Sequence, residues 1–405
     1  MTMYSAKVMA PSEVEQFTTT FNDMGELRRI LDVHGVAIVT DVIPSTELET
    51  LEGEFMKDLM ELIDTEALEG APQAVKDAHE KFLKEGVRAF PLATAELFTE
   101  AAGFCVKKGL AQGRFAWRIR QHPRVRDVFR SIFPESEELV GGLDVTFFTP
   151  AEQAASEADL FSAHVDQNCH DARSGLGSCD IFQGVVFVWP CESDGSTSTT
   201  VVWPGSHKSV WLQMMKDDAF SNYGEGGFHY CDISSMCDRD SARDLRAGWA
   251  EHARRAVVPR GGMILWNSRT VHTGWKGGPR LAQPVCMEPV SRRSESERVA
   301  KLRLIALGLP STHYASVGMQ HDMILGDPGF MSTTPTPAAA AGPFGGVELP
   351  LKPAIRPAGL HEDADLDALK TLVKVKYSLT GMWKPTTGSR ELLEASVREE
   401  FQRYV

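Results

Sequence analysis

The chain has 405 residues, of which 42% are hydrophobic and 24% are charged, as expected of a globular protein long enough to bury a large core. Its formal net charge of −13 argues against general nucleic-acid binding, which normally requires a basic surface. The sequence shows neither an apolar run of about 18 residues nor a basic N-terminus followed by an apolar stretch, so we expect no membrane span and a cytoplasmic location.

The N-terminal third predicts mainly helices around one strand. Residues 12–31 carry apolar side chains at helical spacing, and Gly35 ends this stretch. The apolar, largely β-branched run 36–39 predicts a buried strand. A second amphipathic helix is expected from Pro44 through Leu62, and its apolar face is interpreted as core.

The pattern changes at about residue 140. From there to residue 291, short β-rich runs alternate with Gly, Pro, Ser and Asp clusters, which indicates a β-sandwich or barrel. Residues 208–254 interrupt these runs with polar and helical sequence and are interpreted as an insertion. We therefore expect one domain over residues 1–331, a mobile low-complexity linker at 332–346, and a helical C-terminal extension over 347–405.

His164 and Asp166 form an H-x-D pair on one of the predicted strands. Side chains two positions apart on a strand point to the same side, and imidazole and carboxylate groups are common metal ligands. A second histidine from another strand would complete a facial triad, which is diagnostic of non-haem iron(II) oxygenases. By itself, however, an H-x-D pair is more often a polar strand edge.

Further motifs follow in a fixed order. They are WPGSHK at residues 203–208, GGMILWNSRTVHTG at residues 261–274, and then Arg280. Together with the H-x-D pair, this series closely resembles the phytanoyl-CoA dioxygenase-like family of iron(II)/2-oxoglutarate oxygenases. The stretch HGVAIVTDVIPSTELETL also looks like the opening strand and helix of that family, so the resemblance covers roughly residues 25–65 and 115–291.

The resemblance implies a mixed, β-dominated fold: a double-stranded β-helix (jelly roll, cupin-like) flanked by N-terminal and C-terminal helices. It implies that His164, Asp166 and His272 bind iron and that Arg280 pairs with 2-oxoglutarate, for which a planar guanidinium is well suited. Thr273 is expected beside the co-substrate as a hydrogen-bond donor. His272 and Arg280 are closer together than is usual in the family, so Lys276 is kept as an alternative partner for the co-substrate.

The implied activity is that of an iron(II)- and 2-oxoglutarate-dependent dioxygenase. It would oxidise, most simply hydroxylate, a C–H bond of a small organic metabolite with O2 and release succinate and CO2, with ascorbate as a candidate reductant. The carboxylate of Asp166 disfavours the halogenating branch, in which a small residue makes room for chloride. No motif identifies the substrate or an oligomeric state.

Two alternatives stay open. One is a jelly-roll metal enzyme that does not use 2-oxoglutarate, such as an ascorbate-dependent oxygenase or a cupin-like isomerase, which would not need Arg280. The other is a non-catalytic binding module on the same scaffold, which the intact triad disfavours.

The remaining histidines and the tryptophans of the β region are given structural interpretations. His207, in the turn motif, is expected to be structural rather than a ligand. Other residues expected to be solvent-facing or core side chains are His170, His229, His313, His321, Trp189, Trp203 and Trp266.

Overall fold

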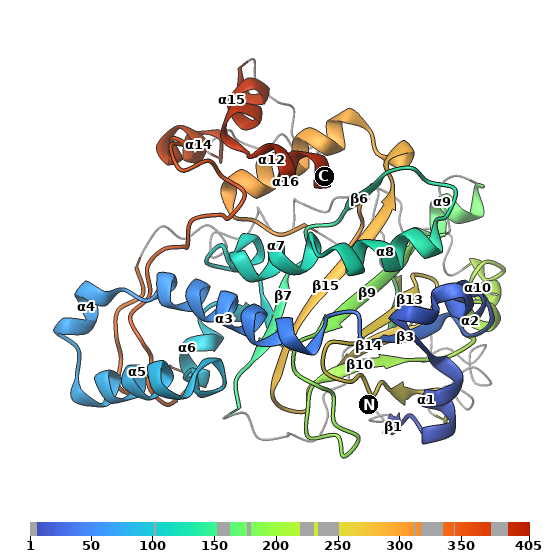
Figure 1. Cartoon of the computed structure of the whole chain (residues 1–405), viewed down its shortest axis with the longest axis horizontal. Coiled ribbons are helices and arrows are strands. Elements are labelled where there is room, and N and C mark those ends of the chain that lie inside the picture. The colour runs from blue at the N-terminus through green and yellow to red at the C-terminus, as the bar shows by residue number, and fades with distance from the viewer. Residues whose placement is uncertain are drawn as a thin grey trace. The chain divides into compact units, whose positions relative to one another are not determined.

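The computed structural model of the chain describes most residues and forms two compact units (Figure 1). The described residues are 6–100, 103–151, 163–175, 180–218, 231–233, 251–311, 313–316, 335–343, 345–373 and 388–405. The first unit comprises residues 1–45, 127–134 and 153–282, and the second comprises residues 46–126, 135–152 and 283–405. This division differs from the expected boundary at residues 332–346, because the second unit gathers segments from both halves of the sequence.

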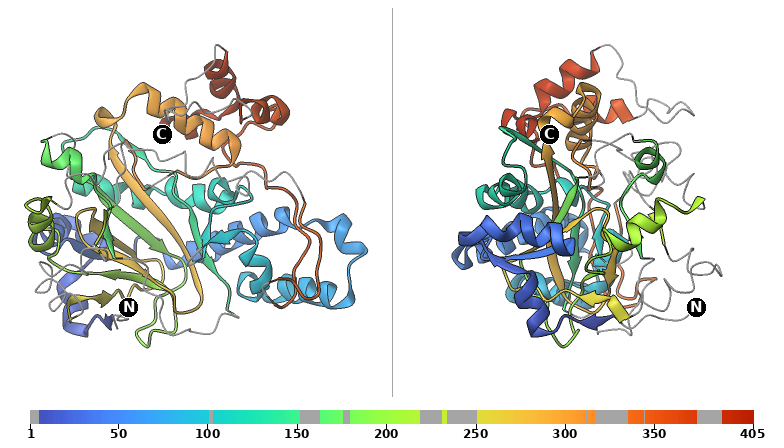
Figure 2. Two further views of the ribbon diagram at one scale, coloured as in Figure 1. Left: turned by 180° about the vertical axis from the view of Figure 1, so that it is seen from behind. Right: turned by 90° about the vertical axis from the view of Figure 1, so that its right-hand side faces the viewer.

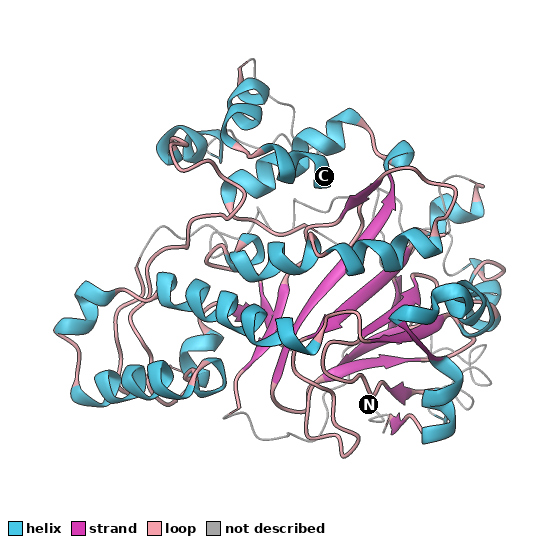
Figure 3. Ribbon diagram, viewed as in Figure 1, coloured by secondary structure: helices cyan, strands magenta, loops and turns pink. Residues whose placement is uncertain are grey.

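Two sheets meet in the first unit (Figure 3). One has the order β1 (Lys7–Val8), β12 (Arg254–Arg255), β10 (Thr199–Val202), β14 (His272–Trp275), β8 (His164–Val165) and β11 (Cys231–Asp232). The other has the order β2 (Thr18–Thr20), β3 (Val36–Thr40), β13 (Met263–Asn267), β9 (Phe182–Phe187) and β15 (Arg280–Pro289).

From β8 to β15 the chain passes repeatedly between these two sheets. Strands β8, β10, β11, β12 and β14 belong to the first sheet, and β9, β13 and β15 belong to the second. This alternation is the winding of a double-stranded β-helix, or jelly roll. The predicted fold class, a mixed and β-rich jelly roll with flanking helices, is confirmed.

Strand β15 continues into the second unit, where its long arrow is visible from behind in Figure 2. There the sheet extends through β7 (Thr146–Thr149), β5 (Phe104–Cys105) and β4 (Thr99–Glu100), and β6 (Leu139–Gly141) also pairs with β15. The α-helices between β3 and β6 in the sequence are α3 (Ser45–Leu62), α4 (Thr65–Glu69), α5 (Gln73–Glu85), α6 (Leu92–Glu96), α7 (Arg114–Arg120) and α8 (Pro123–Ile132). The helix expected from Pro44 through Leu62 is therefore present.

The helix expected over residues 12–31 is wrong in its middle. The chain forms α1 (Pro11–Phe17), then strand β2, then a 3-10 turn (Phe21–Glu26), and only then α2 (Leu27–His34). The three consecutive threonines of β2 pair in parallel with β3, because β-branched side chains favour a pleated strand over a helix. Gly35 ends α2 with φ of 72°, a left-handed conformation that favours glycine.

After β15 the chain forms α12 (Glu295–Leu307), whose N-terminus is stabilised by a capping box between Ser294 and Glu297. Residues 335–343 are not a free linker, since Thr336 and Leu351 exchange two backbone hydrogen bonds of 2.8 and 2.9 Å, and Ala339 pairs in the same way with Glu348. The predicted insertion contains the short helix α10 (Ser209–Met214), and most of its remainder lies outside the described residues.

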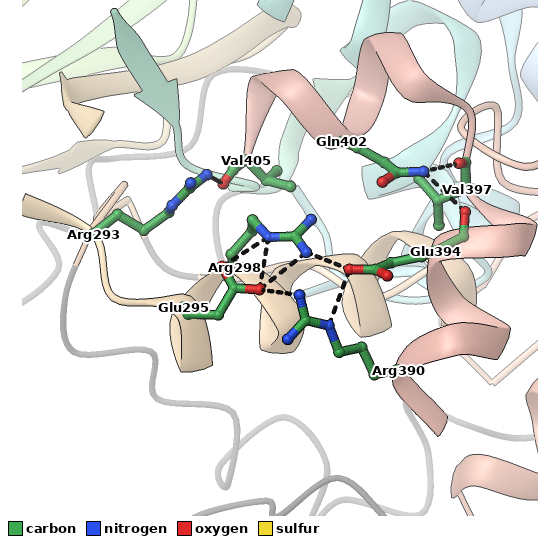
Figure 4. Close-up of polar contacts among 8 residues, drawn as sticks. All are labelled: Arg293, Glu295, Arg298, Arg390, Glu394, Val397, Gln402 and Val405. Atoms are coloured by element: carbon green, nitrogen blue, oxygen red, sulfur yellow. Dashed lines mark hydrogen bonds and ion pairs between the residues drawn. The ribbon is translucent and has the colours of Figure 1, made fainter. Parts of the chain in front are cut away.

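The C-terminal helices are α14 (Leu366–Val373), α15 (Ser389–Ser396) and α16 (Glu399–Tyr404). Helices α15 and α16 are separate, because Val397 leaves the helix to form a bridge with Leu360. Arginine and glutamate side chains connect α15 to α12 (Figure 4). No described helix is long and apolar enough to cross a membrane.

Candidate metal centre

The three predicted ligands come together inside the jelly roll of the first unit. Strands β8 and β14 are antiparallel neighbours, and their register places His164 directly opposite His272. The two imidazole centroids are 4.4 Å apart. Asp166 follows β8 immediately, and one donor atom from each of the three residues lies within 4.8 Å of the others. Paired strands therefore create the cluster that the sequence could only suggest.

His272 is held in one orientation. Its Nδ1 lies 3.0 Å from the carbonyl oxygen of Thr270, and because a carbonyl only accepts, Nδ1 must carry the proton. The other nitrogen, Nε2, lies 2.9 Å from Asp166 Oδ2. This arrangement presents the Nε2 lone pair to the cluster, as in metal sites where a backbone carbonyl fixes the histidine tautomer.

Asp166 is held by two further groups. Its backbone N–H donates to Ser268 O at 3.0 Å, and its Oδ2 accepts from Gln183 Nε2 at 3.0 Å. Asp166 Oδ1 lies on the His164 side, 3.8 Å from Nε2 of that residue. With Gln183 on Oδ2, we expect Asp166 to bind a metal through Oδ1.

The donor set fits a divalent transition metal. Asp166 is only 2% exposed, and a carboxylate at that depth is stable only when positive charge or strong donors compensate for its lost hydration. Two imidazoles and one carboxylate on one side of an ion suit iron(II) and leave the opposite positions for exogenous ligands. Among the described residues, this is the one cluster of three or more His, Cys, Asp or Glu side chains that could hold a metal.

Arg280 lies in the same interior, at the start of β15. It is 3% exposed, and its guanidinium carbon is 5.5 Å from the centre of the Phe187 ring. Burial lowers the pKa of Arg280 to about 10, so the side chain remains charged at neutral pH. A buried, permanently charged guanidinium inside a barrel is suited to binding a carboxylate.

The short interval between His272 and Arg280 has a structural explanation. The backbone N–H groups of Gly277 and Gly278 both donate to Ser198 Oγ, at 3.1 and 3.2 Å. A Cβ on Gly277 would lie 2.6 Å from the carbonyl oxygen of Thr197, so only glycine permits this approach. After this tight turn Arg280 is buried, whereas Lys276 is only half-buried. Arg280 is therefore the better candidate of the two for binding the co-substrate.

Thr273 does not lie where it was expected. On a strand its side chain faces away from that of its neighbour His272, and in register it pairs with Val201. Val201 belongs to an apolar cluster on the outer face of the sheet, with Val165, Trp211 and Met214. This placement puts Thr273 on the face opposite the metal cluster and argues against the predicted contact with the co-substrate.

His207 has the structural place that was expected. Its Nε2 lies 3.1 Å from the carbonyl oxygen of Asp32, and a Cβ on Gly35 would collide with its ring at 2.3 Å. Burial lowers the pKa of His207. Of the other histidines, His170 is exposed and His313 half-buried, while His229 and His321 lie outside the described residues.

Two residues of this interior were not recognised from the sequence. Gln183 is a polar side chain in an otherwise apolar strand, FQGVVF, and that exception could have identified it. Trp266 was assigned to the core, yet it is the register partner of Gln183 and its ring centroid lies 5.0 Å from that of His272.

Comparisons with known proteins add low-identity structural neighbours. No protein-family model matches the sequence, and no curated protein matches it either. The apo form of EctD from S. alaskensis is 16% identical with a TM-score of 0.37, over 66% of this chain and 77% of that one. The epimerase SnoN, solved with Fe3+, alpha ketoglutarate and nogalamycin RO, is 14% identical with a TM-score of 0.35, over 69% and 84%. A putative oxidoreductase from Salmonella typhimurium LT2 is 10% identical with a TM-score of 0.44, over 75% and 80%.

Proposed function

We propose that the chain is a non-haem iron(II) oxygenase that uses 2-oxoglutarate as co-substrate, as in the phytanoyl-CoA dioxygenase-like family that its motifs resemble. The observation that carries the proposal is the His164–Asp166–His272 cluster inside a jelly roll that also buries Arg280. Metal, oxo acid and dioxygen together would supply the oxidising power to attack a C–H bond of a small organic molecule, with succinate and CO2 as products.

The protein's own contribution is to hold and orient these groups. Thr270 and Gln183 fix the orientation of His272 and Asp166, so the ligand atoms are positioned before a metal arrives. His164, Asp166 and His272 would hold the metal and would leave other coordination positions for the oxo acid and dioxygen. Hydroxylation is the simplest outcome of such a site.

The position of Arg280 favours a dicarboxylate co-substrate. Along the inner face of β9, Gln183 lies beside the metal cluster and Phe187 lies beside Arg280. These two positions are four residues apart, or about 13 Å at the usual rise of a strand. A 2-oxoglutarate molecule that binds the metal at one end would extend its other carboxylate along this face toward Arg280. A metal enzyme that does not use an oxo acid would have no such need for a buried arginine.

The test is anaerobic titration of the purified protein with iron(II) and 2-oxoglutarate, followed through the visible charge-transfer band of the chelate. We expect the band in the wild type, its loss in His272→Ala, and weaker co-substrate binding in Arg280→Ala. His170→Ala is the matched control, since it removes an exposed histidine and should retain the band. Absence of the band in a wild-type protein that binds iron(II) would refute the role of 2-oxoglutarate.

A further inference from the structure

Trp266 has a buried donor with no acceptor. The residue is 6% exposed, and its Nε1–H has no hydrogen-bond partner in the described part of the chain. An indole N–H can only donate, so its missing partner must be an acceptor. A buried donor without an acceptor is unfavourable, and a bound ligand that accepts from it would remove that cost.

The face of the sheet on which Trp266 lies is known from two contacts. It stands opposite Gln183 in the antiparallel pair of β13 and β9, and residues directly opposite each other share a face. Gln183 reaches Asp166 from that face, and the Trp266 ring lies beside that of His272. The indole N–H of Trp266 therefore lies on the same face of the sheet as the metal cluster and close to it.

Alternate side chains of β9 and β13 form a row on the inner face of the sheet, and the two ends of this row differ. Gln183 and Trp266 form the metal end, Val185 and Ile264 form the next register pair, and Phe187 follows beside Arg280. 2-Oxoglutarate has a carboxylate at each end, and Arg280 suits only the one that lies farther from the metal. Among the described residues at the metal end, Trp266 Nε1–H is a buried donor without an acceptor, and the carboxylate next to the metal would supply one.

We propose that the indole N–H of Trp266 donates a hydrogen bond to the metal-proximal carboxylate of the oxo acid, making Trp266 a co-substrate-binding residue. This inference rests on the proposed function. It predicts recognition of the oxo acid at both ends, by a neutral donor at the metal and by a cation at the far carboxylate. A hydrogen bond to a charged acceptor is stronger than one between neutral groups.

The first test compares binding affinities. Trp266→Phe should weaken 2-oxoglutarate binding in the anaerobic iron(II) titration by roughly tenfold. Its affinity for the metal alone, measured with manganese(II), should stay within about twofold, which would separate loss of the donor from damage to the ligands. Trp275→Phe is the control, because Trp275 also buries an Nε1 without a described acceptor but packs on the outer face of the sheet.

A second measurement does not depend on how the variant folds. In zinc(II)-loaded, ¹⁵N-labelled wild-type protein, the indole proton of Trp266 should move downfield when 2-oxoglutarate is added, while that of Trp275 should not. The Trp266 resonance is assigned by its absence from the Trp266→Phe spectrum.

The outcomes separate the two proposals. If the wild type forms no chelate with 2-oxoglutarate, the proposed function fails and this inference falls with it. If the wild type forms the chelate, and Trp266→Phe binds 2-oxoglutarate equally well with no shift of the indole proton, only the role of Trp266 is overturned.

Discussion

The interior of the jelly roll and the contact between α12 and α15 both gather charged and polar side chains, but at very different depths. In the interior, Asp166 and Arg280 are 2% and 3% exposed. Between the helices, the side chains of Glu295 and Arg390 are 52% and 49% exposed (Figure 4). Buried charges such as Asp166 and Arg280 need specific partners, whereas exposed charges such as Glu295 and Arg390 keep much of their hydration. The buried charges of the interior therefore need bound partners, whereas the exposed ion pairs between α12 and α15 add little stability.

The largest effect is expected at Asp166. Asp166→Asn keeps the shape of the side chain but removes the negative charge that a divalent metal needs, so metal affinity should fall by more than about 100-fold, beyond the loss typical of a residue that only orients a ligand. Anaerobic calorimetry with manganese(II) would measure the affinity. Near-wild-type binding would show that the metal site lies elsewhere.

Metal binding should also stabilise the first unit. A metal that binds only the folded state adds about 2.7 kcal/mol to the free energy of unfolding at a concentration 100 times its Kd. Thermal unfolding with and without manganese(II) would show this as a higher Tm, and a chelator should reverse it. The same metal should leave the Tm of Asp166→Asn unchanged, and an equal rise in that variant would contradict the assignment.

A smaller effect is expected from Gln183, which touches Asp166 but not the metal. Gln183→Leu should reduce metal affinity by about 10- to 100-fold, because Asp166 would lose the donor on Oδ2. Gln121→Leu makes the same change at an exposed position and should have no effect. Unchanged metal binding in Gln183→Leu would mean that the backbone contact to Ser268 is enough to orient Asp166.

The smallest effects, on the free energy of unfolding, are expected from the ion pairs between α12 and α15. Arg298 donates to Glu295 at 3.0 Å and also pairs with Glu394, and with its side chain 15% exposed, Arg298→Ala should cost about 1 kcal/mol. Arg390→Ala, at a more exposed site, should cost about 0.5 kcal/mol or less. Chemical denaturation in low and high salt would measure both, and neither variant should change metal affinity.

The Arg298 pairs also have a defined pH dependence. Hydrogen bonds from Arg298 lower the pKa of Glu295 and of Glu394. Because the folded-state pKa is depressed, this stabilisation is present above the ordinary carboxyl pKa of about 4.3 and is lost as the pH falls below it. The difference in unfolding free energy between wild type and Arg298→Ala should therefore shrink below about pH 4.

Local patterns in the sequence were sufficient for several features of the chain. The continuous apolar run of β3, the apolar face of α3 and the H-x-D spacing depend on periodicity alone, and each is present in the structure. The β-rich runs alone indicated only a sandwich or barrel, and the jelly roll was expected from the family resemblance that the ordered motifs carry. Helical periodicity gave the wrong prediction for β2, where three β-branched threonines pair with β3 instead of continuing a helix.

Only the tertiary structure decided which side chains meet. The register of β8 against β14 brings His164 to His272, and the register of β9 against β13 brings Trp266 to Gln183. The pairing of β14 with β10 places Thr273 on the outer face, opposite Val201, although Thr273 adjoins a predicted ligand in sequence. A strand alternates its faces at every residue, so a position next to a ligand in sequence points away from it, while a residue many positions away can lie directly opposite. The sequence alone therefore determined the types of ligand and their strands, and the pairing of those strands determined the site.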